Sequence, residues 1–188
     1  SSVALVDVDD EAGERRMIKG QSVRVEALSG FDFSSVAVAI VAGEREFGLQ
    51  CIGAIRDAGA LVVDTTGLLA GQGASVVAEV NPQALADAAQ RRAVSCPDAQ
   101  VVQSALVLKA LAGMSDLRRV SISTYQSMST HSKAAVEGLA MQTGRLLNGQ
   151  PIEKGGVLDK QVAFNLLPAT SEIDASGASR EERDLVNG

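Results

Sequence analysis

The sequence predicts an α/β chain in which a parallel-sheet half, up to about residue 95, is followed by a mixed α+β half. Residues 36–42 form a continuous apolar run, VAVAIVA, which is typical of a central parallel strand. A helix at 44–58, with apolar residues at helical spacing, and a strand at 61–64 follow this run. Together they predict a right-handed strand–helix–strand crossover. Residues 119–125 alternate apolar and polar side chains, which favours an antiparallel strand buried on one face.

The remaining elements are predicted from periodicity and from capping residues. Five further strands are expected, at residues 3–8, 22–25, 75–80, 92–95 and 161–167. Three further helices are expected, one starting at Asn81-Pro82 with Asn81 as its N-cap, one at 99–111 and one at 129–147. Ser179 and Glu182 have the spacing of a capping box, which predicts the start of another helix.

Composition excludes several classes of function. The chain has 188 residues, 46% of them apolar and 21% charged, as in ordinary globular proteins. It has no apolar run of about 18 residues, so we expect no membrane span. A net charge of −6 and 3% aromatic residues disfavour nucleic acid as a partner. The two cysteines and the missing signal-peptide pattern predict a cytoplasmic protein, and a single histidine, His131, predicts no metal site.

Two groups of residues could carry chemistry. Asp7, Asp9 and Asp10 follow the first expected strand, where a dinucleotide-binding fold often holds ribose hydroxyls, although loop acids exposed to solvent are the alternative. Cys96 precedes Pro97 at a helix start, where the helix dipole would stabilise a thiolate. A purely structural cysteine is the alternative, because no base pairs with it in the sequence. These residues alone do not identify an enzyme.

Several motifs occur in the order found in one enzyme family. Residues 121–129 (SISTYQSMS), followed by KAAVE at 133–137, resemble the aspartate-semialdehyde dehydrogenase family, which has STYQ and a lysine-containing helix there. Further similar motifs follow the family's order over nearly the whole chain: Ala42-Gly43, VVDTTG at 62–67, EVNP at 79–82, QVAFNLLP at 161–168 and Glu181-Glu182.

The resemblance implies a fold and a domain division. It implies an incomplete Rossmann-like parallel sheet in a partial NAD(P)-binding domain, residues 1–95. A partial α+β dimerisation-type domain, residues 96–188, is expected to follow. It also implies that the chain is the middle of a protein about twice as long, and that this protein forms a homodimer.

The resemblance also implies binding residues. NADP is the family's cofactor, and Gly43, Thr65 and Thr66 are the expected cofactor-binding residues. Gln126 corresponds to the glutamine that orients the substrate carbonyl, and Glu181 to a ligand of the substrate amine.

The sequence departs from the family where its chemistry is concentrated. In an ungapped alignment the nucleophilic cysteine falls on Ala99, so we predict no catalytic residue. Cys96 lies three residues too early, and its sulfur is expected to point into the preceding strand end. Cations that bind phosphate groups in the family fall on Ala70, Asp184 and Asp10, and an acid repels a phosphate.

These departures leave three hypotheses. The leading one is a catalytically silent paralogue of aspartate-semialdehyde dehydrogenase with a binding or scaffolding role, for which an unknown protein is one candidate partner. The second is an active NADP-dependent aspartate-semialdehyde dehydrogenase of amino-acid biosynthesis. The third is a small-ligand sensor that retains a pocket around Gln126 and Glu181.

Overall fold

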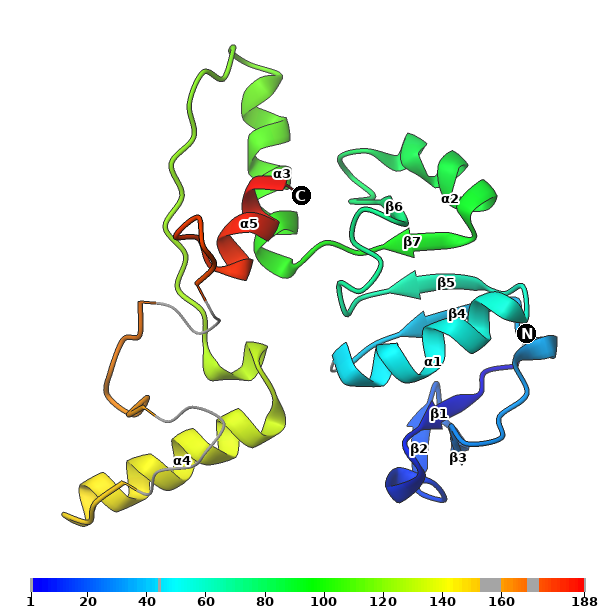
Figure 1. Cartoon of the computed structure of the whole chain (residues 1–188), viewed down its shortest axis with the longest axis horizontal. Coiled ribbons are helices and arrows are strands. Elements are labelled where there is room, and N and C mark those ends of the chain that lie inside the picture. The colour runs from blue at the N-terminus through cyan, green and yellow to red at the C-terminus, as the bar shows by residue number, and fades with distance from the viewer. Residues whose placement is uncertain (1, 44, 153–159, 169–172, 188) are drawn as a thin grey trace. The chain divides into compact units, whose positions relative to one another are not determined.

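The structure is a computed structural model that describes residues 2–43, 45–152, 160–168 and 173–187 (Figure 1). The chain divides into two compact units, Ser1–Lys109 and Ala110–Gly188. The first unit contains all the paired strands, and the second contains helices and extended segments.

The first unit is built on a parallel sheet of four strands in the order β4-β5-β7-β6. The strands are β4 (Val38–Val41), β5 (Leu61–Asp64), β6 (Ala74–Ser75) and β7 (Ala93–Ser95). Helix α1 (Arg45–Asp57) connects β4 to β5, and helix α2 (Leu85–Arg91) precedes β7 (Figure 1). The predicted strand–helix–strand crossover is therefore confirmed.

The main core lies between α1 and the sheet. Cys51, Ile52 and Ile55 of α1 pack against Val41 of β4 and Val62 of β5. Val62 is completely buried, as the continuous apolar run around it predicts. Burying each large aliphatic side chain contributes roughly 1.5–3 kcal/mol, so this contact fixes α1 on the sheet.

A second sheet of three strands opens the first unit. Strand β1 (Leu5–Asp7) pairs in parallel with β3 (Gln21–Ala27), and β2 (Arg15–Ile18) pairs with β3 in antiparallel orientation. The sequence analysis missed β2 because its side chains are mostly exposed and show no alternation. The turn between β2 and β3 is Lys19-Gly20, and both residues have positive φ, as a tight hairpin turn requires.

The strand expected at 75–80 is much shorter than predicted. Strand β6 ends at Ser75, and the side chain of Asn81 folds back over the segment that follows. Its Oδ1 accepts from Val77 N at 2.8 Å, and its Nδ2 donates to Ser75 O at 2.9 Å. Asn81 does stand at the predicted N-cap position, before the helical turn Pro82–Ala84, but its side chain makes no capping hydrogen bond because its amide serves the preceding loop.

The second unit follows helix α3 (Ala99–Ala112) and contains α4 (Lys133–Leu147) and α5 (Arg180–Asn187). The capping box of α5 is confirmed: Ser179 N donates to Glu182 Oε2 at 2.6 Å, and Glu182 N donates to Ser179 Oγ at 3.2 Å. Among the described residues, no helix is long and apolar enough to cross a bilayer.

Two expected strands of the second unit are absent. Residues 119–125 and 161–167 are extended or turned, and neither forms a ladder with another described segment. Val120 and Ile122 are 46% and 43% exposed, so the described residues cover only part of the apolar face that the alternation predicts. Alternation reports a face suited to burial, but a strand also needs a hydrogen-bonding neighbour.

A buried carboxylate organises the loop after β5. Asp64 is 0% exposed and accepts three hydrogen bonds, from Thr66 N at 2.8 Å, Thr66 Oγ1 at 2.6 Å and Leu69 N at 2.7 Å. Hydrogen bonds to an ionised acceptor are stronger than neutral ones. Asp64 therefore fixes the conformation of residues 64–69.

We expect Asp64→Asn to lower the free energy of unfolding by about 2–3 kcal/mol. The asparagine side chain has an NH₂ group in place of one carboxylate oxygen, so at least one of the groups that donate to Asp64 loses its acceptor. Urea denaturation followed by circular dichroism measures the loss. Asp57→Asn, at the exposed end of α1, is the matched control and should change stability by less than about 0.5 kcal/mol. Equal effects of the two substitutions would contradict the role assigned to Asp64.

Candidate functional site

The carboxyl ends of three parallel strands meet at one edge of the larger sheet. Gly43 lies two residues after β4, Thr65 directly follows β5, and Cys96 directly follows β7. Thr65 N donates to Val41 O at 3.0 Å, and Cys96 N donates to Asp64 O at 2.8 Å. In open α/β sheets, ligands bind beyond this edge, so it is the candidate functional site of the first unit.

The three residues expected to bind a cofactor lie at this edge. Gly43 is exposed, with φ of +117°, and a Cβ atom there would meet nothing within 4 Å. Thr65 is exposed, but its hydroxyl donates to Val41 O at 3.1 Å. Thr66 is only 9% exposed, and its hydroxyl donates to Asp64. Gly43 and Thr65 therefore remain accessible to a ligand, whereas the Thr66 side chain serves the loop.

Sequence reasoning missed a cation at the same edge. Arg45 is the first residue of α1, is exposed, and donates from Nη1 to Gly67 O at 3.2 Å. The sequence analysis looked for cations only at the positions that the family resemblance indicated. The position of Arg45, shortly after a predicted strand and Gly43, could have indicated this cation from the sequence. Arg45 gives this edge a positive charge that the alignment did not anticipate.

Helix α3 begins beside this edge with a residue that has no reactive group. Ala99 is exposed and is the first residue of α3. The preceding Asp98 caps the helix, because its Oδ1 accepts from Gln100 N at 2.9 Å and its O accepts from Val102 N at 3.0 Å. In the described part of the chain, Gln100 Nε2 is buried without a hydrogen-bond partner. The helix start is thus well formed but offers no nucleophile at Ala99.

Cys96 lies in an apolar setting. Its side chain packs against the buried cluster of Ala74, Ala88 and Val94, as expected for a sulfur that points into the strand end. Burial raises the pKa of the Cys96 thiol, and the negative charge of Asp64 raises it further. Burial and the charge of Asp64 therefore favour the neutral thiol, which is the structural alternative for Cys96.

The two expected substrate-binding residues lie in the second unit. Gln126 is half-buried, and its Oε1 accepts from Thr130 Oγ1 at 3.5 Å. Glu181 is half-buried in the first turn of α5. Neither residue lines the pocket found in the first unit.

The turn before α5 is held by a second carboxylate. The hydroxyl and backbone N–H of Ser176 donate to Asp174 and lower the pKa of its carboxyl to about 2. Arg183 of α5 also donates to Asp174. The backbone hydrogen bond from Ser179 likewise lowers the pKa of Glu182. These charges anchor the start of α5 and so fix the backbone position of Glu181.

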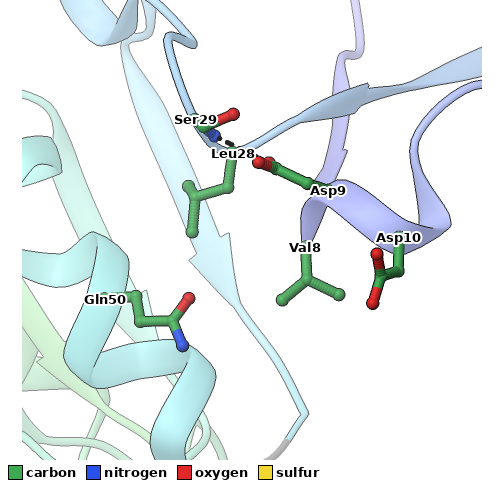
Figure 2. A pocket seen from close by; sticks show the side chains of 6 residues that line it. All are labelled: Val8, Asp9, Asp10, Leu28, Ser29 and Gln50. Atoms are coloured by element: carbon green, nitrogen blue, oxygen red, sulfur yellow. Dashed lines mark hydrogen bonds between the residues drawn. The ribbon is translucent and has the colours of Figure 1, made fainter.

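A pocket of about 450 Å³ lies beside β1 (Figure 2). Its lining comes from the ends of β1 and β3 and from α1, and consists of Val8, Asp9, Asp10, Leu28, Ser29 and Gln50. Asp9 Oδ1 accepts from Ser29 N at 3.2 Å, the bond drawn in Figure 2. Two of the three acids singled out in the sequence, Asp9 and Asp10, therefore border a cavity, and Asp7 is not part of its lining.

The described residues contain no group of three His, Cys, Asp or Glu side chains placed to hold a metal ion. His131, the only histidine, is half-buried and follows the helical turn Met128–Thr130.

Known proteins resemble the chain over most of its length. It is 32% identical to "Aspartate-semialdehyde dehydrogenase 2" of Vibrio cholerae over 176 residues, which are 93% of this chain and 52% of the relative. It is 37% identical to "USG-1 protein homolog" of Azotobacter vinelandii over 93% of this chain and 52% of the relative. The chain thus spans about half the length of these relatives.

Solved structures share the fold. The crystal structure of aspartate semialdehyde dehydrogenase II from Vibrio cholerae, complexed with ASA, gives a TM-score of 0.91 at 30% identity, over 99% of this chain and 56% of that one. A probable aspartate-semialdehyde dehydrogenase from Pseudomonas aeruginosa gives 0.84 at 32% identity, over 98% and 55%.

Residues 108–188 match the family described as "Semialdehyde dehydrogenase, dimerisation domain". In sequence and in fold, the chain is therefore similar to aspartate-semialdehyde dehydrogenases and to USG-1 homologues over about half the length of those proteins.

Proposed function

We propose that this protein is a non-catalytic member of the aspartate-semialdehyde dehydrogenase-like family and acts by binding. The observation that carries the proposal is Ala99. By resemblance it occupies the nucleophile's position, and it presents an exposed methyl group at the start of α3. A covalent thioacyl intermediate requires a thiol, so the family's reaction has no attacking atom at this position.

Cys96 is a poor replacement for the missing nucleophile. Its side chain packs on an apolar cluster, and its pKa is raised, so the thiol stays protonated at neutral pH. The thiolate is the reactive form of cysteine. To act as the nucleophile, Cys96 would have to rotate its side chain out of the cluster, and its thiol would need a lower pKa.

Charge supports the same proposal. Positions at which the family holds phosphate-binding cations carry Ala70, Asp10 and Asp184 here. Asp184 is paired with Arg180 within α5 at 3.4 Å, so a neighbouring cation is already engaged. Capture of a phosphorylated substrate or of inorganic phosphate is disfavoured where the protein supplies negative charge.

Not every similar relative is named as a dehydrogenase. Two relatives named "USG-1 protein homolog", from Azotobacter vinelandii and Pseudomonas aeruginosa, are 37% and 35% identical to this chain, against 32% for the Vibrio cholerae enzyme. The dimerisation-domain match favours a homodimer built through the second unit, which exposes Val120, Ile122 and Tyr125.

One observation favours the alternative, an active dehydrogenase. Arg45 supplies an exposed cation at the sheet edge, next to the expected cofactor residue Gly43. A cation there could hold a phosphate group of a dinucleotide or of a substrate. This alternative still lacks a nucleophile at Ala99, so we rank it second.

The deciding experiment is an assay of phosphate-dependent NAD and NADP reduction with aspartate semialdehyde, on the full-length protein. We expect no reduction above a blank, because no thiolate is placed to attack. Measurable turnover after Ala99→Cys, combined with Asp10→Arg and Asp184→Lys, would show that only these residues are missing. Turnover by the wild type that Cys96→Ser abolishes would overturn the proposal.

Alkylation tests the state of Cys96 directly. We expect iodoacetamide to modify Cys96 more slowly than free cysteine at pH 7, with a rate that climbs about tenfold per pH unit up to pH 9, since only the thiolate reacts. Peptide mass spectrometry separates Cys96 from the buried Cys51, and the protein in guanidinium chloride is the control. A rate that is already constant from pH 7 upward would contradict the raised pKa.

A further inference from the structure

We infer that the pocket beside β1 excludes the 2′-phosphate of NADP, so that the dinucleotide this protein can take is NAD. The inference goes beyond the proposed function, because it concerns which nucleotide binds and holds whether or not the protein is a catalyst. It also departs from the cofactor that the family resemblance implies.

The position of the pocket points to a nucleotide. Strands β1 and β3 are parallel, with Asp7 opposite Ala27 at their carboxyl ends. The two lining segments continue from these ends and are joined by a hydrogen bond from Leu28 N to Asp7 O at 2.8 Å. The crevice beyond the carboxyl ends of parallel strands is where open α/β sheets bind nucleotides.

The lining suits the sugar of an adenosine but not a phosphate. A volume of about 450 Å³ lies within the usual range for small-ligand sites. Val8 and Leu28 supply apolar surface, and Gln50 reaches in from α1 (Figure 2). Carboxylates accept hydrogen bonds but cannot donate them, which matches a ribose with two free hydroxyls.

The charge of the lining decides against NADP. Two of the six lining residues, Asp9 and Asp10, are acids, and none of the six is Lys, Arg or His. A phosphate monoester carries about −1.5 to −2 charges at neutral pH. Facing two carboxylates across a few ångströms of partly solvated space, it should lose tenfold or more in affinity relative to a hydroxyl.

Asp9 and Asp10 have different local tasks, which allows a clean test. Asp9 Oδ1 also accepts from Ser29 N at 3.2 Å, so Asp9→Asn removes the charge and keeps an oxygen acceptor for the loop. Asp10 is exposed at the pocket. Asp10→Asn removes its charge without changing its size. The double variant therefore changes the electrostatics of the pocket with little cost to folding.

The test is calorimetric titration of the full-length protein with NAD, NADP, 5′-AMP and 2′,5′-ADP, a binding readout that does not depend on catalysis. We expect NAD and 5′-AMP to bind at least tenfold more tightly than their 2′-phosphorylated partners. The double variant Asp9→Asn with Asp10→Asn should reduce the ratio of the two affinities, and Asp10→Arg should make the 2′-phosphorylated nucleotides the tighter ligands. Added salt should also reduce the ratio, because screening weakens the repulsion.

Glu26→Gln is the control, since it removes one exposed negative charge from β3 outside the pocket lining and should leave the ratio unchanged. Equal or tighter binding of NADP by the wild type would overturn the inference. So would a ratio that the double variant leaves unaltered. Binding of neither dinucleotide by the wild type would overturn the assignment of NAD to this pocket.

Discussion

The buried carboxylate of Asp64 sets both the shape and the chemistry of the sheet edge. Its side chain holds the loop after β5 through Thr66 and Leu69, and its backbone oxygen accepts from Cys96 N. The same negative charge raises the pKa of the Cys96 thiol. A structural requirement of the loop therefore acts against thiolate formation at Cys96, at the end of β7.

The parallel sheet was predictable because burial on both faces leaves a strong pattern in the sequence. The run around β4, the helical spacing in α1 and the apolar strand β5 gave the crossover correctly. Strand β2 was not predictable in this way, because RRMI has three exposed side chains and no period of two. The only local feature of the sequence that indicates this hairpin is Lys19-Gly20. Both residues have positive φ in the structure, but the residue types alone do not establish such a turn.

The second unit shows the limit of reasoning from alternation. Residues 119–125 have the side-chain pattern of a strand, yet the hydrogen-bonding partner that makes a strand is not a property of the segment itself. Around 161–167 a side chain takes the place of a neighbour, because Gln142 Oε1 accepts from Val162 N at 2.9 Å and Ala163 N at 3.3 Å. Ala99 could be read from the sequence, whereas Arg45 and Asp64 emerged only once the loops were in place.

The two departures that matter for function act on different steps. In the proposed function, Ala99 removes the attacking atom only, so by itself it predicts a protein that still holds the family's ligands. Asp9 and Asp10 act on binding itself, because they place negative charge on a pocket lined by no cation. A protein that had lost only its catalytic activity would not need the negative charges of Asp9 and Asp10 at this pocket. We therefore infer a site with altered selectivity rather than the remains of an NADP site, and this selectivity can be measured without any turnover.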